Sequence, residues 1–147
     1  RLMISASEDI GLANPNALLM ANATFEAVEK IGWPESRIIL SQCAIYLANS
    51  PKGNAAYMAI NKAQITVQNT GNLNVPLSLR NASSSLMKEL GYGEKYKYSH
   101  DFEGNFSSQE FLPDEIAGTC FYKSGSGIKE KEIEEKQNKL WGNKYKK

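Results

Sequence analysis

Apolar residues recur at spacings of three and four along most of the chain, the pattern of helices with one buried face. The pattern predicts a short helix from about residue 5, longer helices over 15–32, 34–49 and 51–70, and a short helix over 81–91. After an interruption, helical spacing returns over 128–141. We therefore expect an all-α fold of five or six helices joined by short turns.

Polar residues mark the expected helix starts. Ser5 and Glu8 have the spacing of a capping box, in which each side chain bonds a free backbone N–H of the first turn. The other expected caps are Asn14, Ser50 and Asn81, the first two directly before a proline. Gly32 is expected to end the second helix in a left-handed conformation.

Each longer helix has an expected buried row. The rows are Leu18, Ala21, Phe25 and Val28; then Leu40, Ala44 and Leu47; then Ala56, Ile60, Ala63 and Val67. Cys43 falls on an expected buried face, where a small apolar residue is typical. The small residues of 55–63 would let a neighbouring helix approach closely.

The segment from Gly91 to Gly127 lacks helical spacing and is rich in glycine and aromatic residues. Such a long irregular stretch is either functional or a flap over the helices, and its aromatics favour the flap because they bury large apolar areas. We expect one domain over 1–147, made of a helical core (1–90), an irregular flap (91–127) and a C-terminal helix with a basic tail (128–147).

The composition narrows the class of protein. A chain of 147 residues with 41% hydrophobic and 22% charged residues fits a globular domain, and its net charge of +1 argues against a nucleic-acid binder charged over its whole surface. Two distant cysteines favour a reducing compartment, and no apolar run reaches the ~20 residues of a membrane span. We expect a cytoplasmic protein without membrane contact. The apolar start after Arg1 suggests a piece of a larger protein.

No complete catalytic, cofactor or metal site is expected. Gly91–Gly93 and Gly125–Gly127 lack the lysine and Ser/Thr of a phosphate-binding loop, so a helix stop and a flexible turn explain them more simply. His100 lies among carboxylates, but their spacing does not match a calcium loop, and an ordered loop contact is the simpler interpretation. The chain itself is therefore not expected to be an enzyme.

Nucleic-acid contact is an alternative interpretation. Lys95 and Lys97 alternate with tyrosines, as in a stacking platform, but residues 94–128 hold three lysines against six acidic residues. The last nineteen residues hold seven lysines against four glutamates, although a solvated helix face with a frayed tail also fits that balance. The candidate DNA contacts are Lys139, Lys144, Lys146 and Lys147.

Several longer strings carry a family resemblance. They are 5–15 (SASEDIGLANP), 17–23 (ALLMANA), 31–35 (IGWPE), 50–52 (SPK), 56–63 (AYMAINKA), 79–82 (LRNA), 86–93 (LMKELGYG), 98–101 (YSHD) and 111–113 (FLP). Together they resemble the C-terminal region of the RarA (or MgsA) family of AAA+ ATPases, which is similar to the eukaryotic Werner-helicase-interacting ATPase. Ile39 and Ser83 stand where the family pattern has proline, which affects local helix starts only.

The resemblance implies a role in assembly. It implies that ATP and Mg²⁺ bind an ATPase core upstream of this region, which itself is similar to the helical collar of clamp-loader subunits and supports homotetramers. It further implies a bacterial protein of stalled replication forks, associated with the nucleoid, DNA and single-stranded-DNA-binding protein, in replication, recombination and repair. None of the family's catalytic residues corresponds to a position in this chain.

Three hypotheses follow. The leading one is a non-catalytic oligomerisation and interaction domain, with a subunit contact expected at Ala55, Tyr57 or Ala59. The second is a DNA-contacting module of the same ATPase. The third is an independent helical scaffold that resembles tetratricopeptide arrays.

Overall fold

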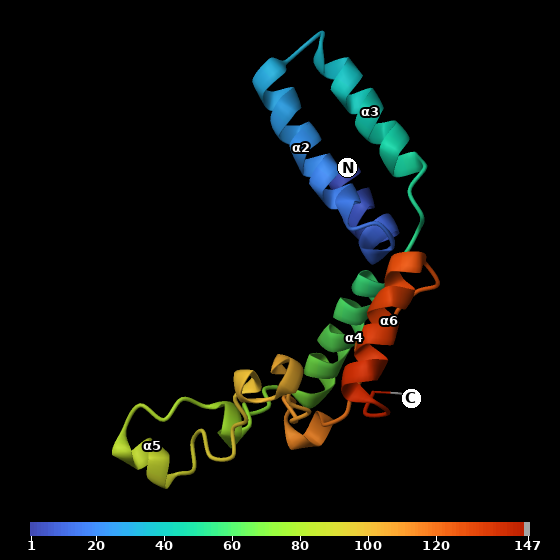
Figure 1. Cartoon of the computed structure of the whole chain (residues 1–147). Helices are drawn as coiled ribbons and strands as arrows, with labels where there is room; N and C mark the ends of the chain where they lie inside the picture. The colour runs from blue at the N-terminus through green and yellow to red at the C-terminus, as the bar shows by residue number, and fades with distance from the viewer. Residues whose placement is uncertain (146–147) are drawn as a thin grey trace. The chain divides into compact units, whose positions relative to one another are not determined.

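The structure is a computed structural model, and it describes residues 1–145. The expected all-α class is confirmed, since the described residues form helices and turns without a strand (Figure 1). The α-helices are α1 (Leu2–Ser5), α2 (Asn16–Ile31), α3 (Ser36–Ala48), α4 (Ala55–Thr70), α5 (Ser85–Glu89) and α6 (Ile128–Trp141). The expectation of a helix over 128–141 is thus confirmed at both ends.

The chain divides into two compact units. Unit 1 contains Arg1–Ile65 and Phe121–Lys136, and unit 2 contains Thr66–Cys120 and the chain from Gln137 onward. Helices α4 and α6 each contribute to both units. The expected segments 1–90, 91–127 and 128–147 follow composition, whereas this division follows contacts in space.

Unit 1 has a core of mostly small side chains. Helices α2 and α3 lie side by side as an antiparallel hairpin, joined at Gly32, which has a φ of 73° (Figure 1). A π-helical turn, η1 (Ala6–Ile10), packs against α2. The buried cluster comprises Ala6, Ile10, Ala17, Ala21, Cys43 and Leu47, which confirms the expected burial of Cys43.

The row of α2 that faces the core is only partly the one expected: Ala21 is buried and Val28 half-buried, as predicted. Ala17, Ala21 and Thr24 are buried, whereas Leu18 and Phe25 are 44% and 59% exposed. The prediction was wrong for Leu18 and Phe25 because it assigned the largest side chains to the inward face. Small residues at spacings of four and three let two helices approach closely, and here they form the contact face.

Helices α3 and α4 show the same deviation. In α3, Leu47 is buried as expected, but Ala44 is exposed and Ser36 takes an inward position. In α4, the expected row is wrong for three of its four members, since the exposed residues are Ala56, Ile60 and Val67. The buried residue of α4 is Ala55 instead. It is continued by a half-buried row of small residues that comprises Ala59, Ala63 and Thr66.

The expected caps of unit 1 have other roles. Ser5 ends α1 and donates from Oγ to Asp9 at 2.7 Å, so the capping box is not formed. The side chain of Asn14 donates to the Tyr46 hydroxyl at 3.1 Å and to Ser50 Oγ at 3.0 Å. These bonds join the start of α2 to the end of α3. Helix α4 begins only at Ala55, so the expected start after Ser50 was wrong.

Unit 2 contains the irregular segment that the sequence predicts. Between α5 and Cys120 the chain forms only three short 3₁₀ turns, η4 (Ser99–Asp101), η5 (Glu103–Asn105) and η6 (Asp114–Ile116). Helix α5 is capped by Ser84, which accepts from the Met87 N–H at 3.3 Å, rather than by Asn81. Ser84 directly precedes α5, whereas Asn81 lies too far upstream to reach its free N–H groups.

Candidate functional site

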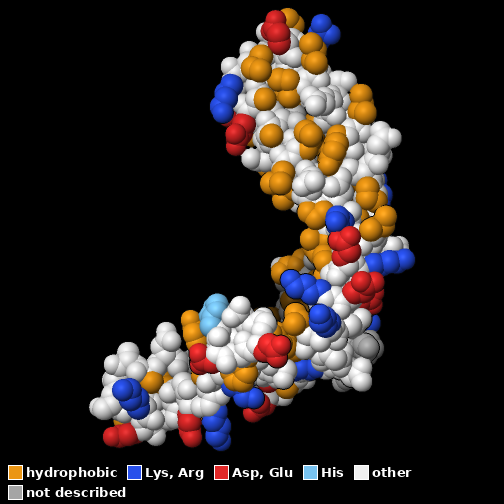
Figure 2. All heavy atoms as spheres, in the orientation of Figure 1, with side chains coloured by type: hydrophobic (Ala, Val, Ile, Leu, Met, Phe, Trp, Pro, Cys, Tyr) orange, Lys and Arg blue, Asp and Glu red, His pale blue; other side chains and the backbone are white. Residues whose placement is uncertain are grey.

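The main surface feature of unit 1 is a set of exposed large apolar side chains on α2, α3 and the turn between them. Trp33 in the turn is 73% exposed, and Ile38 and Ile45 on α3 are 60% and 61% exposed. Figure 2 shows hydrophobic side chains spread over this face of the hairpin. The set comprises Leu18, Leu19, Phe25, Ile31, Trp33, Ile38 and Ile45.

The outward side of α3 is almost free of charge. Arg37 is the only charged residue between Ser36 and Ala48. Ile38 and Ile45 are seven residues apart, two helical turns, and they point away from the buried Cys43. Exposed large apolar side chains on a face with a single charge are typical of a surface that a partner covers, so this face has the character of an interface.

The residues expected to form a subunit contact do not share one face. Ala55 and Ala59 are four residues apart on one side of α4, where Ala55 is buried and Ala59 half-buried. Tyr57 lies about half a turn away and is exposed. Sequence reasoning missed the exposed row of α3 because it sought on that helix only a row that meets the core, namely Leu40, Ala44 and Leu47.

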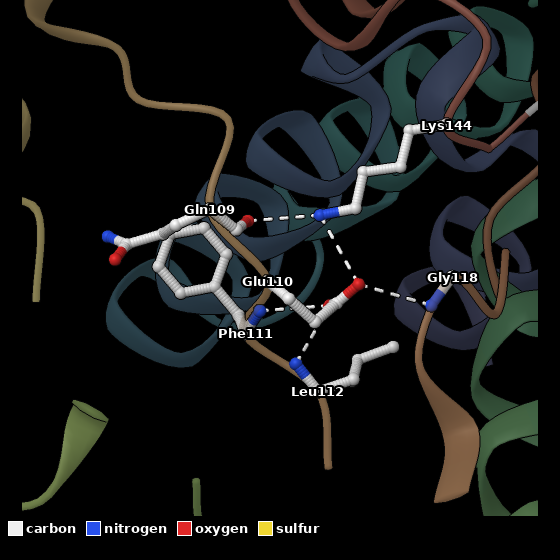
Figure 3. Close-up of polar contacts among 6 residues, drawn as sticks. All are labelled: Gln109, Glu110, Phe111, Leu112, Gly118 and Lys144. Atoms are coloured by element: carbon white, nitrogen blue, oxygen red, sulfur yellow. Dashed lines mark hydrogen bonds and ion pairs between the residues drawn. The ribbon is translucent and has the colours of Figure 1, made fainter. Parts of the chain in front are cut away.

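Two of the four candidate DNA-contacting lysines can be placed in full. Lys139 is exposed on α6. Lys144 is 22% exposed, and its ammonium group donates to the Gln109 carbonyl oxygen at 3.0 Å and lies 3.3 Å from a Glu110 carboxylate oxygen (Figure 3). Lys146 and Lys147 lie outside the described residues.

Aromatic rings complete the surroundings of Lys144. Its Nζ lies 4.7 Å from the ring centroid of Trp141 and 5.3 Å from that of Tyr145. The Trp141 ring also makes edge contacts with Phe106 at 4.8 Å and Phe111 at 6.3 Å. These contacts within unit 2 tie Lys144 to its own chain and reduce its availability to an external phosphate.

The carboxylate of Glu110 collects several donors. Its Oε1 accepts from the backbone N–H groups of Phe111 and Leu112 at 2.9 and 3.0 Å, and its Oε2 accepts from Gly118 at 3.2 Å (Figure 3). Burial raises the pKa of Glu110, but the bonds from Leu112, Phe111, Lys144 and Gly118 together outweigh burial and lower the pKa below its ordinary value. Glu110 is therefore an ionised anchor that holds the irregular segment together.

A second carboxylate is buried in unit 1. Glu130 in the first turn of α6 is 1% exposed, and it accepts from the N–H groups of Gly125 at 3.2 Å and Gly127 at 3.4 Å. A Cβ placed on Gly53 would come within 3.1 Å of the same carboxylate oxygens. The backbone of Gly125 and Gly127 thus holds a buried carboxyl group, which joins the start of α6 to the chain before α4.

His100 makes a loop contact, as the sequence suggests. Its Nδ1 lies 3.3 Å from the side-chain oxygen of Asn105, and its ring lies 5.1 Å from that of Tyr98. Within residues 1–145, no group of three or more His, Cys, Asp or Glu side chains is placed to hold a metal ion. In the same part of the chain, no helix is long and apolar enough to cross a membrane.

Comparison with known proteins establishes the family. The sequence profile of the family described as MgsA AAA+ ATPase C terminal matches residues 1–141. The chain belongs to this family. The resemblance carried by strings such as 5–15 and 56–63 is thereby confirmed.

Individual relatives agree with this membership. The chain is 43% identical to an uncharacterised protein of Thermotoga maritima, over 99% of this chain and 23% of that protein. It is 42% identical to replication-associated recombination protein A of Coxiella burnetii, over 95% and 33%. It is 38% identical to ATPase WRNIP1 of Dictyostelium discoideum, over 84% and 14%. The chain therefore spans at most about a third of these relatives.

Proposed function

We propose that this chain is the assembly domain of an ATP-hydrolysing AAA+ protein of DNA replication and recombination. The observation that supports the proposal is the exposed apolar surface of α2 and α3, together with the near absence of charge on α3. The names of the relatives, replication-associated recombination protein A and ATPase WRNIP1, support the cellular process and the ATPase class of the parent.

The free energy of burial favours the covering of this apolar surface by a partner. Complete burial of an exposed side chain of this size contributes about 1.5–3 kcal/mol, so covering Ile38, Ile45 or Phe25, which are 60%, 61% and 59% exposed, contributes somewhat more than half of that. Association costs about 4–15 kcal/mol in lost freedom of motion. The seven exposed apolar residues of the hairpin can together offset that cost, whereas a single exposed residue cannot.

Under this proposal, ATP hydrolysis takes place outside this chain. ATP and Mg²⁺ bind the parent's ATPase core, and this chain holds copies of the parent together as a homotetramer. DNA and single-stranded-DNA-binding protein are partners of the assembled parent. This chain contributes no catalytic group of its own.

Light scattering on the 147-residue chain tests the proposal. At tens of micromolar we expect the mass of an assembly rather than of a monomer. Ile45→Glu adds a charge to the exposed face of α3 and should lower the measured mass, whereas Gln137→Glu on the exposed side of α6 should leave the mass unchanged. A monomeric wild-type chain, or an Ile45→Glu assembly of unchanged mass, would contradict the proposal.

A further inference from the structure

The charges of the chain are segregated along the sequence. Between Ser36 and Lys88 there is no acidic residue, and the segment contains Arg37, Lys52, Lys62, Arg80 and Lys88. The following segment, 94–120, contains six carboxylates against two lysines, a balance of −4. Two surfaces of opposite charge, each with exposed apolar groups, are therefore present in one chain.

The first surface is the outer α3 face, formed by Arg37, Ile38, Ser41 and Ile45. These residues are exposed, and their spacings of three, four and seven place them on one side of the helix. In the described part of the chain, the Arg37 side chain has no hydrogen bond or ion pair. The guanidinium group is a planar fork of donors that matches a carboxylate.

The second surface is the acidic turn, formed by Tyr98, Asp101, Phe102 and Glu103 of unit 2. All four side chains are exposed. Within residues 1–145, neither carboxylate has a hydrogen-bond donor or an ion-pair partner. The turn thus presents two aromatic rings and two unpaired negative charges side by side along the chain.

The backbone of the acidic turn is held by its own hydrogen bonds. Asp101 N–H donates to the Tyr98 carbonyl oxygen at 3.0 Å, and Phe102 N–H donates to that of Ser99 at 3.2 Å. Asn105 N–H donates to the Phe102 carbonyl oxygen at 2.9 Å. A surface that is already ordered loses little conformational freedom when it binds.

We propose that the acidic turn of one copy of this chain binds the outer α3 face of a second copy. In this contact Asp101 and Glu103 receive Arg37, while Tyr98 and Phe102 cover Ile38 and Ile45. The inference rests on the proposed assembly function and names the surfaces that carry it. Charge complementarity identifies the occupant, because the chain itself presents both members of the pair.

A nucleic acid does not fit either surface. The outer α3 face has one cation among apolar side chains, whereas phosphate contacts need several. The acidic turn would repel a phosphate backbone. A protein surface with apolar groups and a rim of opposite charge fits both.

Charge-reversal substitutions at these residues, made in the whole chain, test the contact. Arg37→Glu, and separately the pair Asp101→Lys with Glu103→Lys, should each weaken self-association about tenfold in sedimentation velocity. The matched controls are Lys136→Glu for the first and Glu134→Lys with Glu135→Lys for the second, since these residues are exposed on α6. The controls should behave as the wild type.

Rescue identifies the pairing. Combining all three substitutions in one chain exchanges the charges across the contact, so self-association should return to within about threefold of the wild type. Mixing the two weakened variants should also form a mixed assembly. Reversals that act no differently from their controls, or a triple variant as weak as its parents, would overturn the contact.

The proposed function and this contact can fail separately. If the wild-type chain is monomeric at tens of micromolar, the assembly function fails, and the contact fails with it. If the wild type assembles and Ile45→Glu disrupts it, but the charge reversals do not, the assembly function stands and the acidic turn is not the partner.

Discussion

The backbone N–H of Gly125 donates a hydrogen bond to the carboxylate of Glu130, with 3.2 Å between nitrogen and oxygen. A Cβ at position 125 would lie 2.5 to 2.6 Å from the two carboxylate oxygens. The absence of a side chain at Gly125 therefore allows a buried carboxylate to sit against the backbone at the start of α6.

Gly125→Ala is expected to destabilise unit 1 by about 1–3 kcal/mol, the usual cost of forcing a methyl group into a filled site. Urea unfolding followed by Trp33 fluorescence in a Trp141→Phe background measures the change. Ser126→Ala is the control, because Ser126 is the exposed neighbour in the same loop. Equal unfolding midpoints for the two variants would contradict the close packing described here.

Glu130→Ala is expected to cost about 1–3 kcal/mol, because it leaves the half-buried N–H groups of Gly125 and Gly127 without their acceptor. Glu130→Gln keeps the shape and one acceptor oxygen, so its loss should be smaller. Glu134→Ala on the exposed side of α6 provides the reference. The same unfolding measurement applies, and a Glu130→Ala variant as stable as Glu134→Ala would exclude an anchoring role.

The lowered pKa of Glu110 predicts a loss of stability in acid. The ionised form is favoured in the folded state, so its contribution is complete above the ordinary value of 4.5 and disappears as the pH falls below that value through the folded pKa. Unfolding monitored by Trp141 fluorescence in a Trp33→Phe background should show this loss in the wild type and not in Glu110→Gln.

Lys144→Met provides a further check on Glu110. It removes one of the groups that lower the Glu110 pKa, so the acid-induced loss should be smaller than in the wild type and complete at a higher pH, with the same onset near 4.5. Glu115→Gln is the control, since Glu115 is exposed and unpaired within residues 1–145. If Glu110→Gln and Lys144→Met leave the loss of stability at low pH unchanged, other carboxylates cause that loss.

The internal contacts of Lys144 also predict which lysine near the C-terminus contributes to DNA binding. Lys144→Ala should destabilise the contacts around the Trp141 ring. It should leave any DNA affinity unchanged, because the ammonium group of Lys144 is already bound to Gln109 and Glu110. Lys139 is exposed, so Lys139→Ala should reduce the salt dependence of DNA binding by about one phosphate contact.

Fluorescence anisotropy with single-stranded and forked DNA at two salt concentrations measures both effects. An affinity loss in Lys144→Ala as large as that in Lys139→Ala would mean that Lys144 leaves its internal partners to meet DNA.

The presence of the longer helices and most of their C-terminal ends could be predicted from local sequence, whereas the starts of α1, α4 and α5 could not. The spacing of Ile133 and Leu140, and the glycine at 127, define α6, and Gly32 and Gly71 end α2 and α4 at positive φ. Such signals act within a turn or two of helix, so they need no knowledge of the rest of the chain. Family membership was equally accessible, because it depends on strings of residues rather than on their contacts.

The orientation of those helices was decided only by the tertiary structure. In α2, Ala21 has Leu18 and Phe25 on one side and Ala17 and Thr24 on the other, and periodicity alone does not say which of these pairs meets α3. The smaller pair is buried because it lets the two backbones come close, which leaves the larger side chains for another surface. A row of small residues at these spacings was the available signal.

The roles of the charged residues depended on distant partners. Lys144 contacts Gln109 and Glu110, 35 and 34 positions earlier, and Glu130 lies against Gly53. Sequence spacing predicts contacts only between residues a few positions apart, so it described Lys144 as a free cation and gave Glu130 no role. The sequence by itself thus determined the helices and the family. Folding decided which side chains remain on the surface for a partner, because burial depends on contacts between segments far apart in the chain.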